Sequence, residues 1–157
     1  MERYHNMPLA FDHSLTSALS EPPSRPLAES RLNIVVIFTS TAGTTAALRK
    51  AGALAESLAA RITLIVPQVV PYPLPLTSPP VLLDFQENRF RDLAAQVPAE
   101  THVQLYLCRD ELETLTNFLP ANSLVIIGRS KSWWRSRESR LARKLRSRHE
   151  IVFAETE

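Results

Sequence analysis

The sequence predicts an α/β protein in which a parallel sheet of five strands is covered by helices on both faces. After residue 32, short apolar runs rich in β-branched residues alternate with segments that carry apolar residues at helical spacing. Short runs that are apolar throughout are typical of strands buried on both faces. Strict alternation of strand and helix predicts parallel pairing through right-handed crossovers. The predicted strands are residues 34–38, 62–66, 103–107, 124–127 and 151–154.

Four helices are predicted between these strands. The first has apolar residues at helical spacing over 47–58, and the fourth centres on 141–145. The second is predicted to begin at the Ser-Pro-Pro sequence of residues 78–80, because proline suits the first turn of a helix. The third is predicted to begin at Asp110, whose carboxylate caps the helix with Glu113 in capping-box register.

Prolines mark the irregular parts of the chain. Six of the twelve fall between Pro67 and Pro80, which predicts a stiff, extended connection that does not pair in the sheet. Residues 1–31 carry four more and show no sustained period. These residues are expected to form a flexible leader, with a short apolar segment around residues 9–19 as its one exception, followed by one domain over 32–157.

Several classes of protein are excluded or disfavoured by composition. No apolar run approaches the roughly 20 residues that cross a bilayer. The N-terminus lacks the basic-then-apolar order of a signal peptide, so we expect a cytoplasmic protein. A single cysteine excludes a disulfide scaffold, and three scattered glycines exclude an intact dinucleotide or Walker loop.

Four segments, taken in order, resemble the universal stress protein family. Residues 33–60 resemble its first strand, small-residue turn and Ala/Leu helix, and 61–66 its second strand. Residues 110–128 resemble its third helix and fourth strand ending in glycine, and 139–153 its last helix and strand. The resemblance implies a Rossmann-like, doubly wound sheet of strand order 3-2-1-4-5. It also implies a homodimer through the last strand, HEIVFAETE (149–157).

The resemblance further implies a ligand site beyond the carboxyl ends of the strands, where the first and fourth diverge. In nucleotide-binding members ATP lies there, and a loop after the fourth strand holds its phosphates. That loop reads Gly, two residues, Gly, nine residues, Gly, then Ser or Thr. Here Gly128 fills the first position, Lys131 replaces the second glycine, and the third is missing. Thr39 stands where the family carries an acidic residue, so the ATP site is expected to be degraded.

The resemblance still indicates which residues would contact a nucleotide such as ATP or AMP. Thr39 and Ser40 offer hydroxyls at the end of the first strand, which serve equally as a helix cap. The Gly-Arg-Ser-Lys-Ser run at 128–132 is either a replacement anion site or a solvated basic loop. The candidates are Thr39, Ser40 and Val66 for the nucleoside, and Gly128, Arg129, Ser130, Lys131 and Ser139 for the phosphates.

Charge is polarised along the chain despite a net value of +2. Residues 128–149 carry nine Lys or Arg against one acid, Glu138, so the remainder carries nine basic and fifteen acidic residues. The basic stretch is either a solvated helix face or a site for a polyanion, nucleic acid or an acidic partner, beside Trp133 and Trp134. The cations expected to contact such a partner are Arg137, Arg140, Arg143 and Lys144.

No catalytic or metal-binding constellation stands out. The four histidines form no spaced ligand pair. Arg109 beside Cys108 could lower the thiol pKa, although a lone strand cysteine is usually a packing residue. We therefore expect a sensing or adaptor module of the stress-protein kind, not an enzyme, with weak or absent adenine-nucleotide binding. The alternative is polyanion binding, and the third hypothesis is weak ATP hydrolysis.

Overall fold

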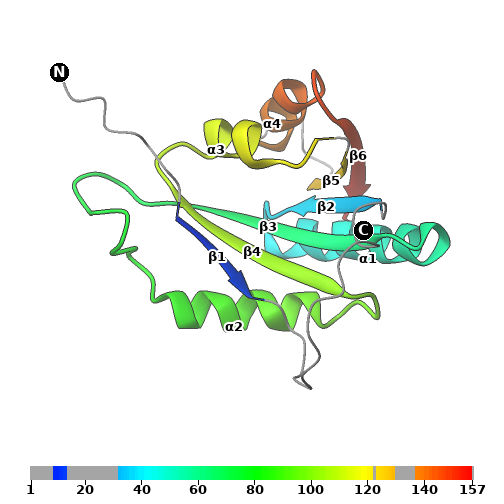
Figure 1. The fold of residues 1–157 in the computed structure, drawn as a ribbon, viewed down its shortest axis with the longest axis horizontal. Helices are drawn as coiled ribbons and strands as arrows, with labels where there is room; N and C mark the ends of the chain where they lie inside the picture. Colours follow the sequence, from blue (N-terminus) through cyan, green and yellow to red (C-terminus); the bar gives the residue numbers. More distant parts are fainter. Residues whose placement is uncertain (1–8, 14–31, 122, 130–136, 157) are drawn as a thin grey trace, which may run out of the picture.

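A computed structural model describes residues 9–13, 32–121, 123–129 and 137–156 (Figure 1). They form one six-stranded sheet of order β1-β4-β3-β2-β5-β6 between two layers of helices. The strands are β1 (Leu9–His13), β2 (Asn33–Ile37), β3 (Arg61–Val69), β4 (Thr101–Cys108), β5 (Leu124–Arg129) and β6 (Glu150–Glu155). The helices are α1 (Thr41–Leu58), α2 (Leu83–Ala94), α3 (Glu111–Phe118) and α4 (Arg137–Leu145).

The five predicted strands are parallel neighbours in the order 3-2-1-4-5, as expected. Successive residues of the central strand β2 face opposite helical layers. Ile34 and Val36 are fully buried in the cluster that α1 and α2 cover, and Val35 and Ile37 in the cluster that α3 and α4 cover. Apolar residues on both faces of one strand explain the continuous apolar runs in the sequence.

Strand β1 is a difference from the sequence prediction, which placed residues 9–13 in a flexible leader. It pairs antiparallel with β4, from Leu9 opposite Leu107 to His13 opposite Val103. By pairing there, it covers an edge of β4 whose N–H and C=O groups would otherwise be exposed. The other leader residues, 1–8 and 14–31, lie outside the described part of the chain.

The proline-rich segment also differs in part from the prediction. β3 continues through Pro67 to Val69, whereas its pairing with β2 ends at Ile65. The proline lies where the strand has a partner on one side only, a position that tolerates a missing N–H. Beyond β3 the chain leaves the sheet, as predicted, and α2 begins at Leu83 instead of at Ser78.

Two helix caps are as the sequence suggests. Asp110 Oδ1 accepts a hydrogen bond of 2.8 Å from the backbone N–H of Glu113 at the start of α3. Ser40 Oγ accepts one of 3.1 Å from the N–H of Gly43 at the start of α1. Among the described residues, no helix is long and apolar enough to span a membrane.

Candidate functional site

The direction of winding reverses between β2 and β5, so their carboxyl ends meet at the switch point of the sheet. Here the first turn of α1 lies directly on β5. A Cβ atom on Gly128 would be 1.8 Å from the carbonyl oxygen of Gly43. Thr39 Oγ1 also donates a hydrogen bond of 3.1 Å to the Gly128 carbonyl. The glycine at the phosphate-loop position therefore has a packing role: it lets a helix approach the strand closely.

The two hydroxyls predicted to face a nucleoside are both hydrogen-bonded at this helix start. Ser40 Oγ caps α1, and Thr39 Oγ1 is directed to β5. The backbone N–H of Thr39 donates to Thr44 Oγ1 at 3.2 Å. Of the two interpretations open at this turn, the structure supports the capping role for Ser40.

Three of the predicted phosphate residues, Gly128, Arg129 and Ser139, lie in the described part of the chain. Arg129 pairs with Glu155 on β6, its neighbour in the sheet register. Its guanidinium carbon lies 4.6 Å from the centre of the Phe153 ring. Ser139 lies half-buried on α4. Ser130 and Lys131 lie outside the described residues, so the replacement anion site stays a prediction.

Next to the switch point, at the carboxyl end of β3, the surface has a cleft of about 390 Å³. Val66, the predicted adenine-pocket residue, lies in its wall and is 2% exposed. Phe38, which follows β2, and Phe90 on α2 line the same cleft and meet edge to face with ring centres 4.9 Å apart. The cleft thus has an apolar and aromatic wall suited to a planar ring.

Two glutamine amides form part of the polar lining of the cleft. The Oε1 atoms of Gln68 on β3 and Gln86 on α2 are buried and have no hydrogen-bond partner among the described residues. Buried polar atoms are nearly always hydrogen-bonded in proteins, so two orphans in one cleft are unusual. A primary amide accepts through its oxygen and donates through its nitrogen. The pair can therefore recognise a ligand that carries both donors and acceptors.

A cation lies at the rim of the cleft beside the start of α1. Arg89 on α2 lines the cleft, and its Nη2 donates to Thr41 Oγ1 at 3.0 Å. Its guanidinium carbon is 5.9 Å from the ring centre of Phe38 and 5.7 Å from that of Phe90. It makes no ion pair with any carboxylate in the described part of the chain. A positive charge beside a helix N-terminus favours an anionic ligand group.

An ion pair joins the starts of α3 and α4 at the same cleft. Arg137 Nε donates to Glu111 Oε2 at 2.6 Å, and its Nη2 donates to the other carboxylate oxygen. The hydrogen bond to Glu111 raises the pKa of Arg137 above its ordinary value. Arg137, predicted to contact a polyanion, is therefore held by an internal carboxylate, and it lies at the cleft.

Cys108 does not have the character of a reactive thiol. It is 1% exposed, and burial is the main cause that raises its pKa. The neighbouring Arg109 donates through Nη1 and Nη2 to the carbonyls of Val70 and Leu74, each at 2.7 Å. Arg109 thus anchors the proline-rich connection. The described residues include no group of three or more His, Cys, Asp or Glu arranged to hold a metal.

Sequence reasoning missed most of the cleft. Gln86 and Arg89 are three residues apart on α2, a spacing that places them on one helix face. This spacing is the sequence feature that could have indicated a shared site. Gln68 carried no signal, because it was assigned to the unpaired proline-rich connection. For Glu111 the sequence indicated nothing beyond an acid in the first turn of a helix.

The fold and cleft define a doubly wound α/β protein with a small-molecule-sized cleft beside its switch point. No protein-family model matches this sequence, and no curated protein does. A universal stress protein solved in complex with cAMP is similar in structure, with a TM-score of 0.50 and 12% identity over 80% of this chain and 98% of that one. A universal stress protein from Archaeoglobus fulgidus is similar with a TM-score of 0.50 and 15% identity over 78% and 93%. The chain has the fold of the universal stress proteins.

Proposed function

We propose that this chain is a small-molecule sensing module that binds an adenine nucleotide with a single phosphate in the cleft at the end of β3. The observation that carries the proposal is the pair of buried oxygens of Gln68 and Gln86, which have no hydrogen-bond partner among the described residues and lie beside an aromatic wall. Glutamine amides can pair with adenine, whose edge presents an amino donor and ring-nitrogen acceptors. The solved neighbour with cAMP supports this ligand class.

The volume of the cleft and the charge at its rim favour a ligand with one phosphate over a ligand with three. At about 390 Å³, the cleft is near the low end of the roughly 300–1,000 Å³ range of small-molecule sites. Arg89 at the rim supplies one cation beside the first turn of α1, and it has no carboxylate partner among the described residues. The triphosphate loop pattern keeps only Gly128, and the α1 backbone packs against that glycine. These features support AMP or a cyclic monophosphate more than ATP, and signalling by binding more than hydrolysis.

The broader proposal includes a role in stress response and a homodimer. β6 is the last strand of the sheet, and its outer edge has no partner strand in the described part of the chain. A second copy could extend the sheet there or cover that edge. Light scattering of the purified protein at several concentrations tests the dimer, and we expect the mass to rise toward that of two chains. A monomer at all concentrations would contradict it.

A thermal-shift series tests the nucleotide. At a hundredfold excess over the dissociation constant, a ligand of the folded state stabilises by about 2.7 kcal/mol, which raises Tm by roughly 5–10 °C in a domain of this size. We expect AMP and cAMP to shift Tm more than ATP or GMP does.

Two variants locate the site. Gln86→Leu removes an amide from the cleft at similar volume and is expected to abolish the shift. Gln96→Leu makes the same change outside this cleft and is expected to preserve it. Flat melting curves with every nucleotide, or equal shifts in both variants, would contradict the proposed ligand site.

A further inference from the structure

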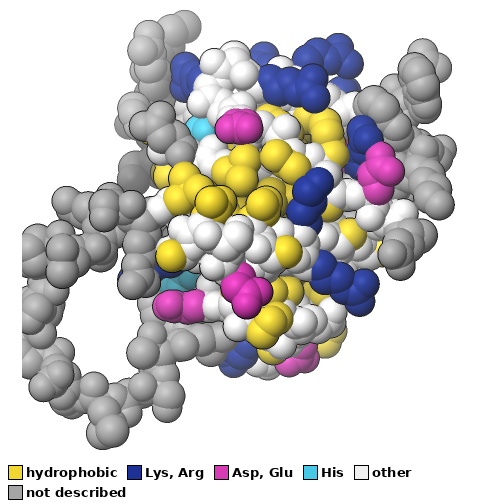
Figure 2. All heavy atoms as spheres, turned by 90° about the vertical axis from the view of Figure 1, so that its right-hand side faces the viewer, with side chains coloured by type: hydrophobic (Ala, Val, Ile, Leu, Met, Phe, Trp, Pro, Cys, Tyr) yellow, Lys and Arg dark blue, Asp and Glu magenta, His cyan; other side chains and the backbone are white. Residues whose placement is uncertain are grey.

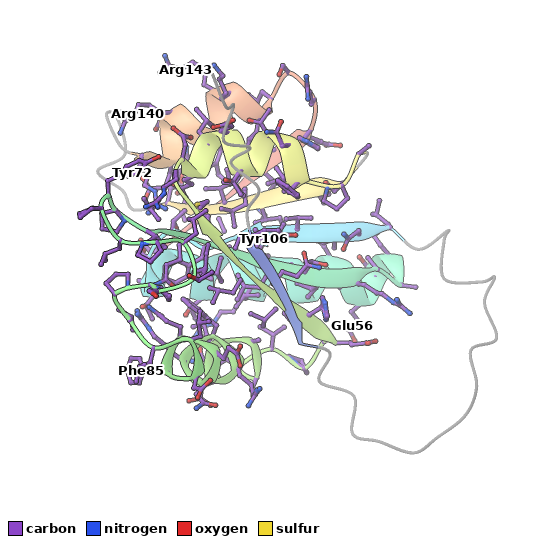
Figure 3. The ribbon with its side chains drawn as sticks, turned by 60° about the vertical axis from the view of Figure 1, so that its left-hand side comes forward. Glu56, Tyr72, Phe85, Tyr106, Arg140 and Arg143 are labelled. Atoms are coloured by element: carbon purple, nitrogen blue, oxygen red, sulfur yellow. The ribbon has the colours of Figure 1, made fainter. Side chains whose placement is uncertain are left out.

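The exposed side of α4 and of the turn after it carries a dense group of cations. We call this surface the α4 basic face, and its members are all exposed: Arg140, Arg143, Lys144, Arg146 and Arg148. Arg140 and Arg143 lie along the outer edge of α4 (Figure 3). In the view turned to the right-hand side of the molecule, Lys and Arg side chains gather over the same end (Figure 2).

The packing of α4 explains why these cations face solvent. Leu141, Ala142 and Leu145 are 4%, 2% and 2% exposed, and they form the side of the helix that packs on the sheet. Except for Ser139, the remaining helical positions carry charged residues, and residues three or four apart lie about 5–6 Å from one another. Arg140, Arg143 and Lys144 therefore form a compact row on one face.

Carboxylates of the described part of the chain do not neutralise this row. The ion pairs found within the described chain hold Arg129 and Arg137, which both lie outside the α4 basic face. None of the five cations of the face has a carboxylate partner among the described residues. Glu138 on the same helix has Leu141 and Ala142 at its i+3 and i+4 positions, so it supports no helical ion pair there. Like charges held this closely favour an external polyanion.

We propose that the α4 basic face binds the phosphate backbone of double-stranded nucleic acid without reading its sequence. Four of the five cations are arginines, whose planar guanidinium groups match phosphate oxygens in pairs. A duplex presents one negative charge per roughly 1.7 Å of its axis, so a helix about 13 Å long meets several phosphates at once. Residues 137–148 contain no Asn or Gln, the residues that typically read adenine.

Other polyanionic partners fit this surface less well. A helix that binds a membrane surface inserts its apolar face into the lipid, whereas the apolar face of α4 is buried against the sheet. Protein interfaces have an apolar core, and no large exposed hydrophobic residue of the described chain lies on α4. The site also lies outside the nucleotide cleft, so it does not depend on the proposed ligand.

Fluorescence anisotropy with two labelled 20-base-pair duplexes of unrelated sequence tests the proposal. We expect equal affinity for both duplexes, and a fall in affinity as salt rises. Each phosphate contact contributes about 0.9 to the log–log slope, so four or five contacts predict a slope near −4. No binding to either duplex in 20 mM salt would overturn the proposal, as would a marked preference for one sequence.

Two matched double variants separate a site from net charge. Arg140→Ala with Arg143→Ala is expected to weaken binding at least tenfold at low salt and to reduce the slope by about 1.8. Arg49→Ala with Arg61→Ala removes the same charge from exposed positions on α1 and β3, away from α4, and is expected to change affinity less than twofold. Equal losses in both variants would overturn the assignment, as would binding to vesicles rich in phosphatidylserine without binding to duplex.

Discussion

Gly128 at the end of β5 lies against the backbone of Gly43 in the first turn of α1. A Cβ atom on Gly128 would lie 1.8 Å from the Gly43 carbonyl oxygen and 2.7 Å from its Cα. Such distances are far below van der Waals contact, and backbone atoms cannot rotate away as a side chain can. This contact sets the position of α1 on the sheet beside the proposed ligand cleft.

Gly128→Ala is therefore expected to lower the free energy of unfolding by about 3 kcal/mol, since overpacking displaces the helix from the strand. Urea denaturation followed by circular dichroism measures the change. Gly52→Ala is the matched control, because its Cβ would meet a side chain and no backbone atom, namely Val97 Cγ1 at 2.6 Å and Val97 Cβ at 4.0 Å. The control also gains helix propensity of up to about 1 kcal/mol. Equal stability of Gly128→Ala and the unchanged protein would contradict the packing role.

The helix cap of α3 makes a smaller contribution. Asp110→Ala removes the acceptor of the 2.8 Å bond from the Glu113 N–H, and it is expected to cost about 1 kcal/mol. Asp110→Asn keeps an acceptor and is expected to retain most of the stability. The midpoints of urea denaturation, at an unchanged m-value, give the change in the free energy of unfolding for each variant. An equal loss of stability in both variants would argue against the cap.

Cys108 is expected to be unreactive in the folded protein. Its burial raises the pKa of the thiol, and the Sγ donates to the Gln68 carbonyl at 3.7 Å. Because the thiolate is the nucleophile, disulfide reagents at pH 8 should modify it on the order of 100-fold more slowly than in the protein unfolded by urea. Stopped-flow absorbance with Ellman's reagent measures both rates, and rapid labelling of the native protein would contradict this interpretation.

Stability is expected to fall in mild acid because of His149. Burial, and then the charge of Arg148, lower the pKa of this imidazole, whose Nδ1 is buried without a hydrogen-bond partner among the described residues. The unfolded chain therefore binds the proton at a higher pH than the folded one. The contribution of neutral His149 to the free energy of unfolding is fully present above about pH 6.5, the ordinary histidine pKa. It is lost as the pH falls below that value.

Melting temperatures between pH 5 and 8 test this dependence. His149→Asn removes the titrating group and should reduce the fall in Tm between pH 6.5 and pH 5, which is the acid limb of the curve. Arg148→Gln removes the second cause of the lowered pKa, so it should flatten the limb only in part. An unchanged acid limb in His149→Asn would assign the effect to other groups.

Arg109 is expected to hold the proline-rich connection in place. Its two hydrogen bonds reach the carbonyls of Val70 and Leu74, and its guanidinium carbon lies 4.1 Å from the ring centre of Tyr72. In Arg109→Ala, hydrogen exchange over residues 70–78 should accelerate about tenfold, as for a local loss of roughly 1.4 kcal/mol. Arg109→Lys keeps the charge but cannot reach both carbonyls as a planar fork does, so exchange should remain faster than in the unchanged protein. Unaltered exchange in both variants would rule out the anchor.

The sequence determined the parts of this protein that depend on local periodicity. Continuous apolar runs such as 34–38 predicted strands buried on both faces, and the structure places them in the expected order. Asp110 marked a helix start because a cap involves only neighbouring residues. The resemblance to universal stress proteins likewise rested on the order of such local segments.

Tertiary structure decided what depends on contacts between distant segments. β1 is a strand because β4 offers an edge, and Pro67 is tolerated because β2 has ended beside it. The cleft brings Gln68 together with Gln86 and Arg89 from another element, and no spacing within the chain encodes that meeting. Gly128 looked like the remnant of a phosphate loop, and only the helix packed against it shows why a glycine is needed there. Periodicity reports which side of a segment is buried, whereas the identity of its neighbours is fixed only when the chain packs.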